Sequence, residues 1–290
     1  MDLAKYIVKA RPGVLGGKHE EKRPLRRLNA LPVKRYVFIN RDSHPDADIY
    51  VAIHEAKNLP SPVPDYQVPH CHNTDEFYYF VGNNADLTGL EGQIIFEGKM
   101  HKIVSPACVY IPTGAVHEYK VTHGAGTVTV LFRNRGYTHE DKPFDLARGE
   151  RDFGRYASYI FSPEVRPTTE IKYHTDAAPG TRYVFVDGKL KPEADFYTVV
   201  RSVAGVQPTQ ANYVDMHRHN CDTQHIAIGT GPELGGLKIE FQIRDDKLVV
   251  ESPVGVNIPA GTPHSQRIIE GTGHFFNFVP KSFYNDGLMS

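Results

Sequence analysis

The stretch that decides how the chain folds runs from Pro69 to Gly82 and reads Pro-His-Cys-His-Asn-Thr-Asp-Glu-Phe-Tyr-Tyr-Phe-Val-Gly. Side chains of a β-strand alternate between its two faces, so an extended stretch would place His70, His72 and Glu76 on one face. Tyr78 would continue that face. Imidazole and carboxylate groups bind divalent transition metals. The stretch therefore predicts a strand that carries three metal ligands.

A second motif follows further along the chain. Residues 108–117 read Cys-Val-Tyr-Ile-Pro-Thr-Gly-Ala-Val-His, which is typical of a short apolar strand followed by a Pro/Gly turn and a histidine. His117 is the expected fourth ligand.

The two motifs together resemble the paired motifs of the cupin superfamily. The first is His-x-His-x3-Glu-x5-Gly, and the second, after Gly98, is Pro-x-Gly-x-x-His. The resemblance implies a small antiparallel β-barrel whose metal ligands are His70, His72, Glu76 and His117. One departure is Val121, which stands where the second motif often ends in Asn.

The same motif occurs twice. His217, His219 and His264 each stand 147 positions after His70, His72 and His117. Further matches in this register are Arg35 with Arg182, Tyr50 with Tyr197, Tyr66 with Tyr213, and Gly114 with Gly261. So many matches in one register indicate a duplicated domain. We therefore predict an all-β protein of two tandem antiparallel cupin barrels (jelly-roll, double-stranded β-helix), a bicupin with a short helical arm and connector.

Changes in composition suggest where the domains begin and end. The predicted parts are an N-terminal arm (1–34), a first cupin domain (35–132), a connector that packs on the barrels (133–181), a second cupin domain (182–279) and a C-terminal tail (280–290). The connector has a short helical stretch near 144–159. Its segment 159–161 echoes residues 6–8, so we interpret the connector as the second barrel's counterpart of the arm. The tail is expected to dock on a barrel surface.

The second domain differs from the first at its predicted metal site. In the repeat register Thr223 takes the position of Glu76, so the second site lacks the anionic ligand. Three interpretations remain open: a three-histidine metal site, a metal held with help from Gln224 or His225, or an empty structural barrel. Strand alternation points His225 inward and Gln224 outward, so His225 is the better spare ligand.

The resemblance implies a metal-dependent enzyme acting on a small organic substrate. The first hypothesis is a non-haem Fe(II) dioxygenase centred on the first domain, with Tyr78 as a contact for substrate or bound O2. Mn, Ni, Cu or Zn would suit the same ligands. The alternatives are an O2-independent decarboxylase, isomerase or lyase, and a non-catalytic ligand-binding or storage bicupin. An oxalate decarboxylase would normally keep the carboxylate in both halves, so Thr223 argues against that subtype.

Composition also indicates which partners and which cellular location to expect. The net charge is −1 and no long basic run occurs, so no nucleic-acid surface is expected. No apolar run approaches the roughly 18 residues of a membrane helix, and no apolar leader is visible. Three cysteines are too few for a disulfide framework, so we expect reduced thiols and a cytoplasmic protein. We also expect a homo-oligomer, most simply a dimer.

Overall fold

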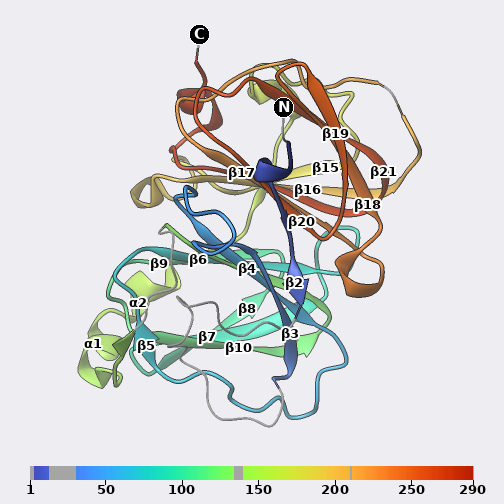
Figure 1. The fold of residues 1–290 in the computed structure, drawn as a ribbon. Helices are drawn as coiled ribbons and strands as arrows, with labels where there is room; N and C mark the ends of the chain where they lie inside the picture. The colour runs from blue at the N-terminus through green and yellow to red at the C-terminus, as the bar shows by residue number, and fades with distance from the viewer. Residues whose placement is uncertain (1–2, 13–30, 134–139, 210, 290) are drawn as a thin grey trace. The chain divides into compact units, whose positions relative to one another are not determined.

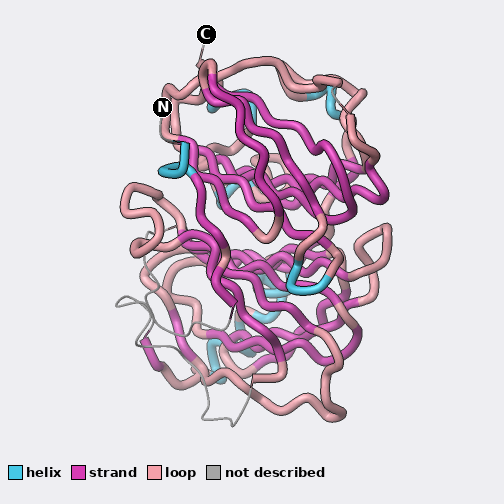
Figure 2. The backbone as a smooth tube through the Cα atoms, turned by 45° about the vertical axis from the view of Figure 1, so that its right-hand side comes forward, coloured by secondary structure: helices cyan, strands magenta, loops and turns pink. Residues whose placement is uncertain are grey.

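The regular structure of the chain is mostly β-strand, as predicted. The structure, a computed structural model, describes residues 3–12, 31–133, 140–209 and 211–289. Strands make up most of its regular structure, and the helices are short (Figure 2). The α-helices of the described residues are α1 (Leu146–Arg151) and α2 (Phe153–Ala157), both within the stretch predicted to be helical. No helix among the described residues is long and apolar enough to cross a membrane.

Two compact units divide the chain. We call residues 11–162 barrel 1, and residues 1–10 together with 163–290 barrel 2. The first ten residues of the predicted arm therefore belong with the C-terminal barrel. The basic part of that arm, residues 18–27, lies outside the described residues.

Barrel 1 consists of two antiparallel sheets. The larger has the order β13 (Ile160–Phe161), β9 (Ala107–Ile111), β6 (Glu76–Gly82), β11 (Gly126–Phe132), β4 (Tyr50–Ala56), β3 (Val33–Ile39) and β2 (Arg11–Pro12). The smaller has the order β12 (Glu140–Asp141), β5 (His70–Cys71), β10 (His117–Gly124), β7 (Leu90–Phe96) and β8 (Lys99–Val104). Strands β4, β6 and β9 lie in one layer and β7, β8 and β10 in the other (Figure 1).

The sequence pattern explains these two layers. In β7, Leu90, Gly92, Ile94 and Phe96 are buried and alternate with half-buried residues, which is the period-two pattern of a strand with one face on a core. Every residue of β6 and β11 is buried, so both of their faces are covered.

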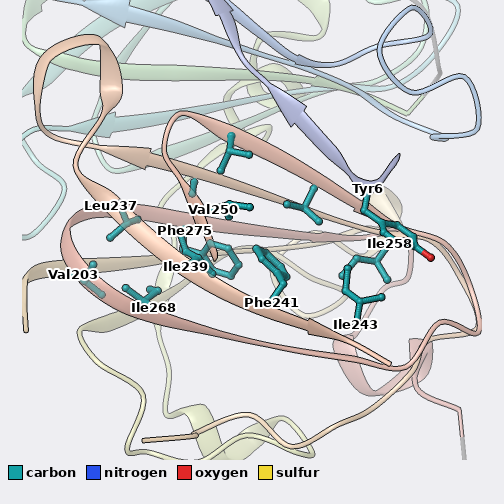
Figure 3. Packing of buried hydrophobic residues seen from close by; sticks show 13 residues of the cluster. Tyr6, Val203, Leu237, Ile239, Phe241, Ile243, Val250, Ile258, Ile268 and Phe275 are labelled. Atoms are coloured by element: carbon teal, nitrogen blue, oxygen red, sulfur yellow. The ribbon is translucent and has the colours of Figure 1, made fainter. Parts of the chain in front are cut away.

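Barrel 2 is a single nine-stranded antiparallel sheet that folds over on itself. Its path is β1 (Ile7–Lys9), β20 (Val254–Ile258), β17 (Thr223–Gly229), β21 (His264–Val279), β16 (Tyr197–Val206), β15 (Thr181–Val186) and β14 (Glu164–Val165), with β18 (Leu237–Ile243) on β21 and β19 (Asp246–Glu251) on β18. The first half of β21 pairs with β18 and the second half with β16 and β17, so this long strand turns the corner of the barrel. Figure 3 shows the apolar core between them, which includes Tyr6 from the N-terminal segment.

The repeat extends to individual hydrogen bonds. The Leu90 backbone N–H donates to Ser105 Oγ at 2.9 Å, and the Leu237 N–H donates to Ser252 Oγ at 3.0 Å, 147 positions later. The duplication predicted from the histidines is thus a duplication of structure.

Two short segments complete equivalent edges of the two barrels. Ile160 of β13 lies opposite Val109 of β9, and Ile7 of β1 lies opposite Val256, the counterpart of Val109. The similarity of the two segments is therefore real, but their assignment to barrels was wrong. The connector segment pairs with barrel 1 and the N-terminal segment with barrel 2. Edge pairing joins strands that are far apart in the sequence, so the local sequence pattern does not indicate which barrel a segment will pair with.

Candidate metal centres

The predicted histidines of barrel 1 meet inside the barrel. His70 and His117 are direct partners on β5 and β10, and their ring centroids lie 4.4 Å apart. The His72 ring lies 4.8 Å from that of His70 and 5.4 Å from that of His117. One nitrogen of each ring lies within 4.8 Å of the others, and all three residues are buried.

The route by which these residues meet differs from the prediction of one continuous strand. Strand β5 ends at Cys71, residues 72–75 turn, and β6 begins at Glu76 in the other sheet. The first motif therefore bridges two sheets. The prediction grouped the correct residues. They meet because the motif crosses from one sheet to the other, and not because they alternate along a single strand.

Glu76 faces two of the three imidazoles. Its Oε2 lies 2.9 Å from His117 Nε2 and 3.4 Å from His72 Nε2. Burial acts to raise the pKa of this carboxyl, but the charges and hydrogen bonds of His72 and His117 outweigh it and hold the pKa well below its usual range. Barrel 1 thus presents a carboxylate to the three rings.

Backbone carbonyls fix which ring nitrogen faces the centre. His70 Nδ1 donates to the Val68 carbonyl at 2.8 Å, and His117 Nδ1 donates to the Ala115 carbonyl at 3.0 Å. A carbonyl can only accept, so Nδ1 carries a hydrogen and Nε2 is the nitrogen that faces the centre, where it can bind a metal when it carries no proton. Burial, together with the neighbouring His117 and His72, lowers the pKa of His70 well below its usual value, which favours the neutral ligand form.

The turn before His117 is attached to the first motif. Gly114 has φ +76°, a conformation that glycine adopts without strain, and its N–H donates to the His72 carbonyl at 2.9 Å. Asp75 Oδ1 accepts the Thr113 N–H at 2.9 Å. These bonds hold the fourth predicted ligand in register with the other three.

Tyr78 also lies at this centre. Its hydroxyl is 3.2 Å from His117 Nε2, and its ring packs on that of Tyr119 at 4.4 Å. The side chain is 1% exposed. The inward face predicted for Tyr78 and Glu76 is the face on which the structure places them.

Barrel 2 repeats this framework. His217 and His264 exchange backbone hydrogen bonds of 3.0 and 2.8 Å, and one nitrogen of each lies within 4.8 Å of the others and of one from His219. His217 Nδ1 donates to the Asp215 carbonyl at 2.8 Å and His264 Nδ1 to the Thr262 carbonyl at 2.9 Å. Both carbonyls are the register counterparts of those in barrel 1. Burial lowers the pKa of His219 to about 3, so its ring is neutral.

The side chains on β17 differ from those on β6. Thr223 replaces the carboxylate, and among the described residues no acidic group joins the three histidines. His225 occupies the register position of Tyr78, and its ring centroid lies 5.5 Å from that of Phe241 and 5.4 Å from that of Phe275. It lies outside the group of three, so its role as a spare ligand stays a prediction. The Gln224 amide donates to Asn257 Oδ1 at 3.0 Å.

Two residues near this centre were missed. Tyr284, in the short 3-10 helix η5 (Tyr284–Gly287) of the tail, has its hydroxyl 2.8 Å from His217 Nε2. His174 is half-buried, with its ring centroid 5.4 Å from that of His217. In the repeat register Tyr284 aligns with Tyr137, and this match could have drawn attention to Tyr284. Tyr137 lies outside the described residues. No histidine aligns with His174 in this register, so the repeat does not single it out.

Both centres fit a divalent transition metal by their donors. Barrel 1 offers three imidazoles and a carboxylate, and barrel 2 offers three imidazoles. In barrel 2, His264 Nε2 and Thr223 Oγ1 are buried and have no hydrogen-bond partner. Unpartnered buried polar atoms are uncommon, and a bound ion would satisfy the imidazole nitrogen. The residues present therefore suit such an ion in each barrel.

Comparison with known proteins identifies the fold of this chain. No family model matches the sequence, and no curated protein matches it. Among solved structures, a mutant of Bacillus subtilis oxalate decarboxylase is 12% identical, with a TM-score of 0.56, over 90% of this chain and 76% of that one. Lactobacillus farciminis oxalate decarboxylase, solved as a formate complex, is 15% identical, with a TM-score of 0.56, over 91% and 85%.

A third similar structure comes from work on the Mn(II) centres of the Bacillus subtilis oxalate decarboxylase. It is 13% identical, with a TM-score of 0.56, over 96% of this chain and 78% of that one. Identities this low speak for the fold alone. With the two histidine triads and the duplicated strands, they establish that this chain has the fold of a bicupin, two cupin barrels in tandem.

Proposed function

We propose that barrel 1 is the active centre of a metal-dependent enzyme acting on a small organic acid. The observation that supports this most is the convergence of three buried imidazoles, two of them with Nε2 fixed inward, on the Glu76 carboxylate. A divalent ion bound there would supply Lewis acidity toward a substrate oxygen, or a place for substrate and O2 to bind together.

Charge points to an anionic substrate. The imidazoles are neutral ligands and Glu76 contributes one negative charge, so a divalent ion leaves one positive charge uncompensated in a buried site. Coulomb attraction is strong where water is excluded. A carboxylate would neutralise this charge on binding.

Tyr78 is the proposed substrate contact. Its hydroxyl lies 3.2 Å from a proposed ligand atom, so it can reach an oxygen bound beside His117. The hydroxyl can donate a hydrogen bond to that oxygen or transfer a proton to it. Replacement of Tyr78 by Phe keeps the ring packing and should lower turnover by about 10²–10⁴ if the hydroxyl acts as a general acid.

The first candidate reaction is decarboxylation or a related lyase reaction. The likeness to oxalate decarboxylases over nine-tenths of the chain favours it, and Mn(II) or Fe(II) would suit the donors. The second candidate is an Fe(II) dioxygenase, favoured by the number of ligands. Four protein ligands leave two positions of an octahedral ion open, enough for substrate and O2.

Gas exchange separates the two candidates. The protein loaded with Mn(II) or Fe(II) would be given a panel of small carboxylic acids, with CO2 release and O2 uptake recorded together. A decarboxylase releases CO2 without stoichiometric O2 uptake, whereas a dioxygenase consumes one O2 per turnover. Absence of turnover in both loaded forms, with ligand binding that does not depend on the metal, would instead support a storage or binding protein.

A further inference from the structure

We propose that Tyr284 supplies barrel 2 with the oxygen donor that Thr223 does not, so that the C-terminal segment completes a metal centre of three imidazoles and one phenol oxygen. The proposal concerns barrel 2 alone and is independent of turnover in barrel 1.

Distances support a ligand position for the Tyr284 oxygen. Neighbouring ligands of an octahedral ion, each about 2.1 Å from it, stand about 3.0 Å apart. Tyr284 Oη donates a hydrogen bond to His217 Nε2 at 2.8 Å, and loss of this hydrogen would leave both atoms free to bind one ion. In barrel 1, Glu76 Oε2 lies 2.9 Å from Nε2 of His117, which is the counterpart of His264 and not of His217. The phenol oxygen thus has a similar spacing from an imidazole to that of the carboxylate in the other barrel, but it approaches a different histidine of the triad.

The tyrosine is firmly held in this position. Its side chain is 2% exposed and packs in a core cluster with Tyr197, whose ring centroid is 5.6 Å away. The segment that carries it is bonded to both neighbours of His219: the Asn220 N–H donates to the Gly287 carbonyl at 2.7 Å, and the Met289 N–H donates to the Arg218 carbonyl at 2.9 Å. Metal centre and tail are therefore parts of one hydrogen-bonded structure.

The tail also fits closely against the proposed ligands. A Cβ added at Gly287 would lie 3.1 Å from His219 Nδ1 and 3.2 Å from Val279 Cγ1. Such contacts are tighter than side chains normally accept, so a larger residue here would lift the tail. Glycine permits the close approach.

The interior of barrel 2 independently points to a bound cation. His264 Nε2 is buried and unpartnered, and it faces a centre with no acidic side chain among the described residues. Leaving a buried polar atom without a partner is unfavourable, and a bound ion would remove that cost. On binding, the Tyr284 O–H bond breaks, an oxygen–metal bond forms, and the proton leaves to water. No oxidant is needed.

The test uses the full chain with barrel 1 emptied by His70→Ala and His117→Ala, and Cu(II) as the probe. We expect one Cu(II) per chain and a phenolate-to-copper charge-transfer band, with phenolate modes in the resonance Raman spectrum. Adding Tyr284→Phe should abolish the band and weaken Cu(II) binding at least tenfold, since even outer partners of a metal site contribute about 10–100-fold.

Tyr197→Phe is the matched control, because its hydroxyl accepts from Arg182 at 2.9 Å and is engaged away from the histidines. It should keep the band and the affinity. Gly287→Val, which displaces the tail but retains Tyr284, should lose both. A parent protein that binds no Cu(II), or binds it without the band, would overturn the proposal without any variant. Undiminished affinity in a folded Tyr284→Phe protein would also overturn it.

Discussion

The two barrels hold three histidines in the same way and surround them with different chemistry. In both, the first histidine of the His-x-His pair and the later histidine are cross-strand partners, and backbone carbonyls at equivalent positions fix their Nδ1 atoms. On the strand that faces these histidines, Glu76 and Tyr78 of β6 become Thr223 and His225 of β17, and in barrel 2 Tyr284 of the tail also lies at His217. Backbone hydrogen bonds set the geometry of a centre, and the side chains around it set its charge and proton donors.

Removal of the later histidine from each barrel gives the largest contrast. His117→Ala should strip metal from barrel 1 and lower turnover more than about 100-fold, because a ligand matters at least as much as its outer partners. His264→Ala should affect turnover much less. Turnover and metal per chain would be measured for both. A greater loss of turnover in His264→Ala would move the chemistry to barrel 2.

Acid should unfold barrel 2 before barrel 1 in the metal-free protein. Burial lowers the pKa of His219 and of His225 from 6.5 to about 3. Between these values the unfolded chain binds more protons than the folded one, so stability falls as the pH falls from about 6.5 toward 3. Each ring contributes roughly 1.4 kcal/mol per pH unit.

Barrel 1 has fewer such groups among the described residues, with His70 the one lowered as far. The lowered pKa of Glu76 makes its contribution persist until the pH falls below about 4.5. Pulsed hydrogen exchange with mass spectrometry would follow each barrel separately. Simultaneous loss of protection in both barrels would contradict this order.

Exchange of the carboxylate between barrels tests the difference directly. Glu76→Gln keeps the shape of the side chain and should weaken metal binding in barrel 1 by about 10–100-fold. Thr223→Glu places an anion beside His264 and should strengthen binding in barrel 2 by about tenfold. Metal affinity measured by competition with a chelator in each variant would check both. Equal metal affinities of the two wild-type barrels would show that the carboxylate gives barrel 1 no advantage in metal binding.

The smallest expected effect is one that the barrels share. Gly114 and Gly261 have φ +76° and +74°, and a Cβ at either would meet nothing within 4 Å. Alanine at each position should therefore cost only the backbone strain, about 1 kcal/mol. Local stability from native-state hydrogen exchange should drop equally in the two barrels. Unequal costs would mean that the two turns are not equivalent.

The resemblance of the two motifs to those of cupins implied the fold, and the repeat predicted its duplication and the grouping of the histidines, because motif and repeat are local or in constant register. The break between β5 and β6 was not predicted, since residues 72–75 carry no strong turn signal beyond Asn73 and Asp75. Tyr284 and His174 reach His217 through contacts between distant segments. Such contacts depend on how the tail and connector dock, which periodicity does not encode. Dimer formation and the predicted domain boundaries stay predictions.

The pairing of β1 with β20 has a consequence for how the protein can be made in parts. A fragment starting at residue 163 would contain nearly all of barrel 2 but would leave the β20 edge open where Ile7, Val8 and Lys9 normally pair. Unpaired edge strands recruit other chains and promote aggregation. During synthesis, residues 7–9 are made before residues 254–256 and must likewise wait for that strand before they can pair.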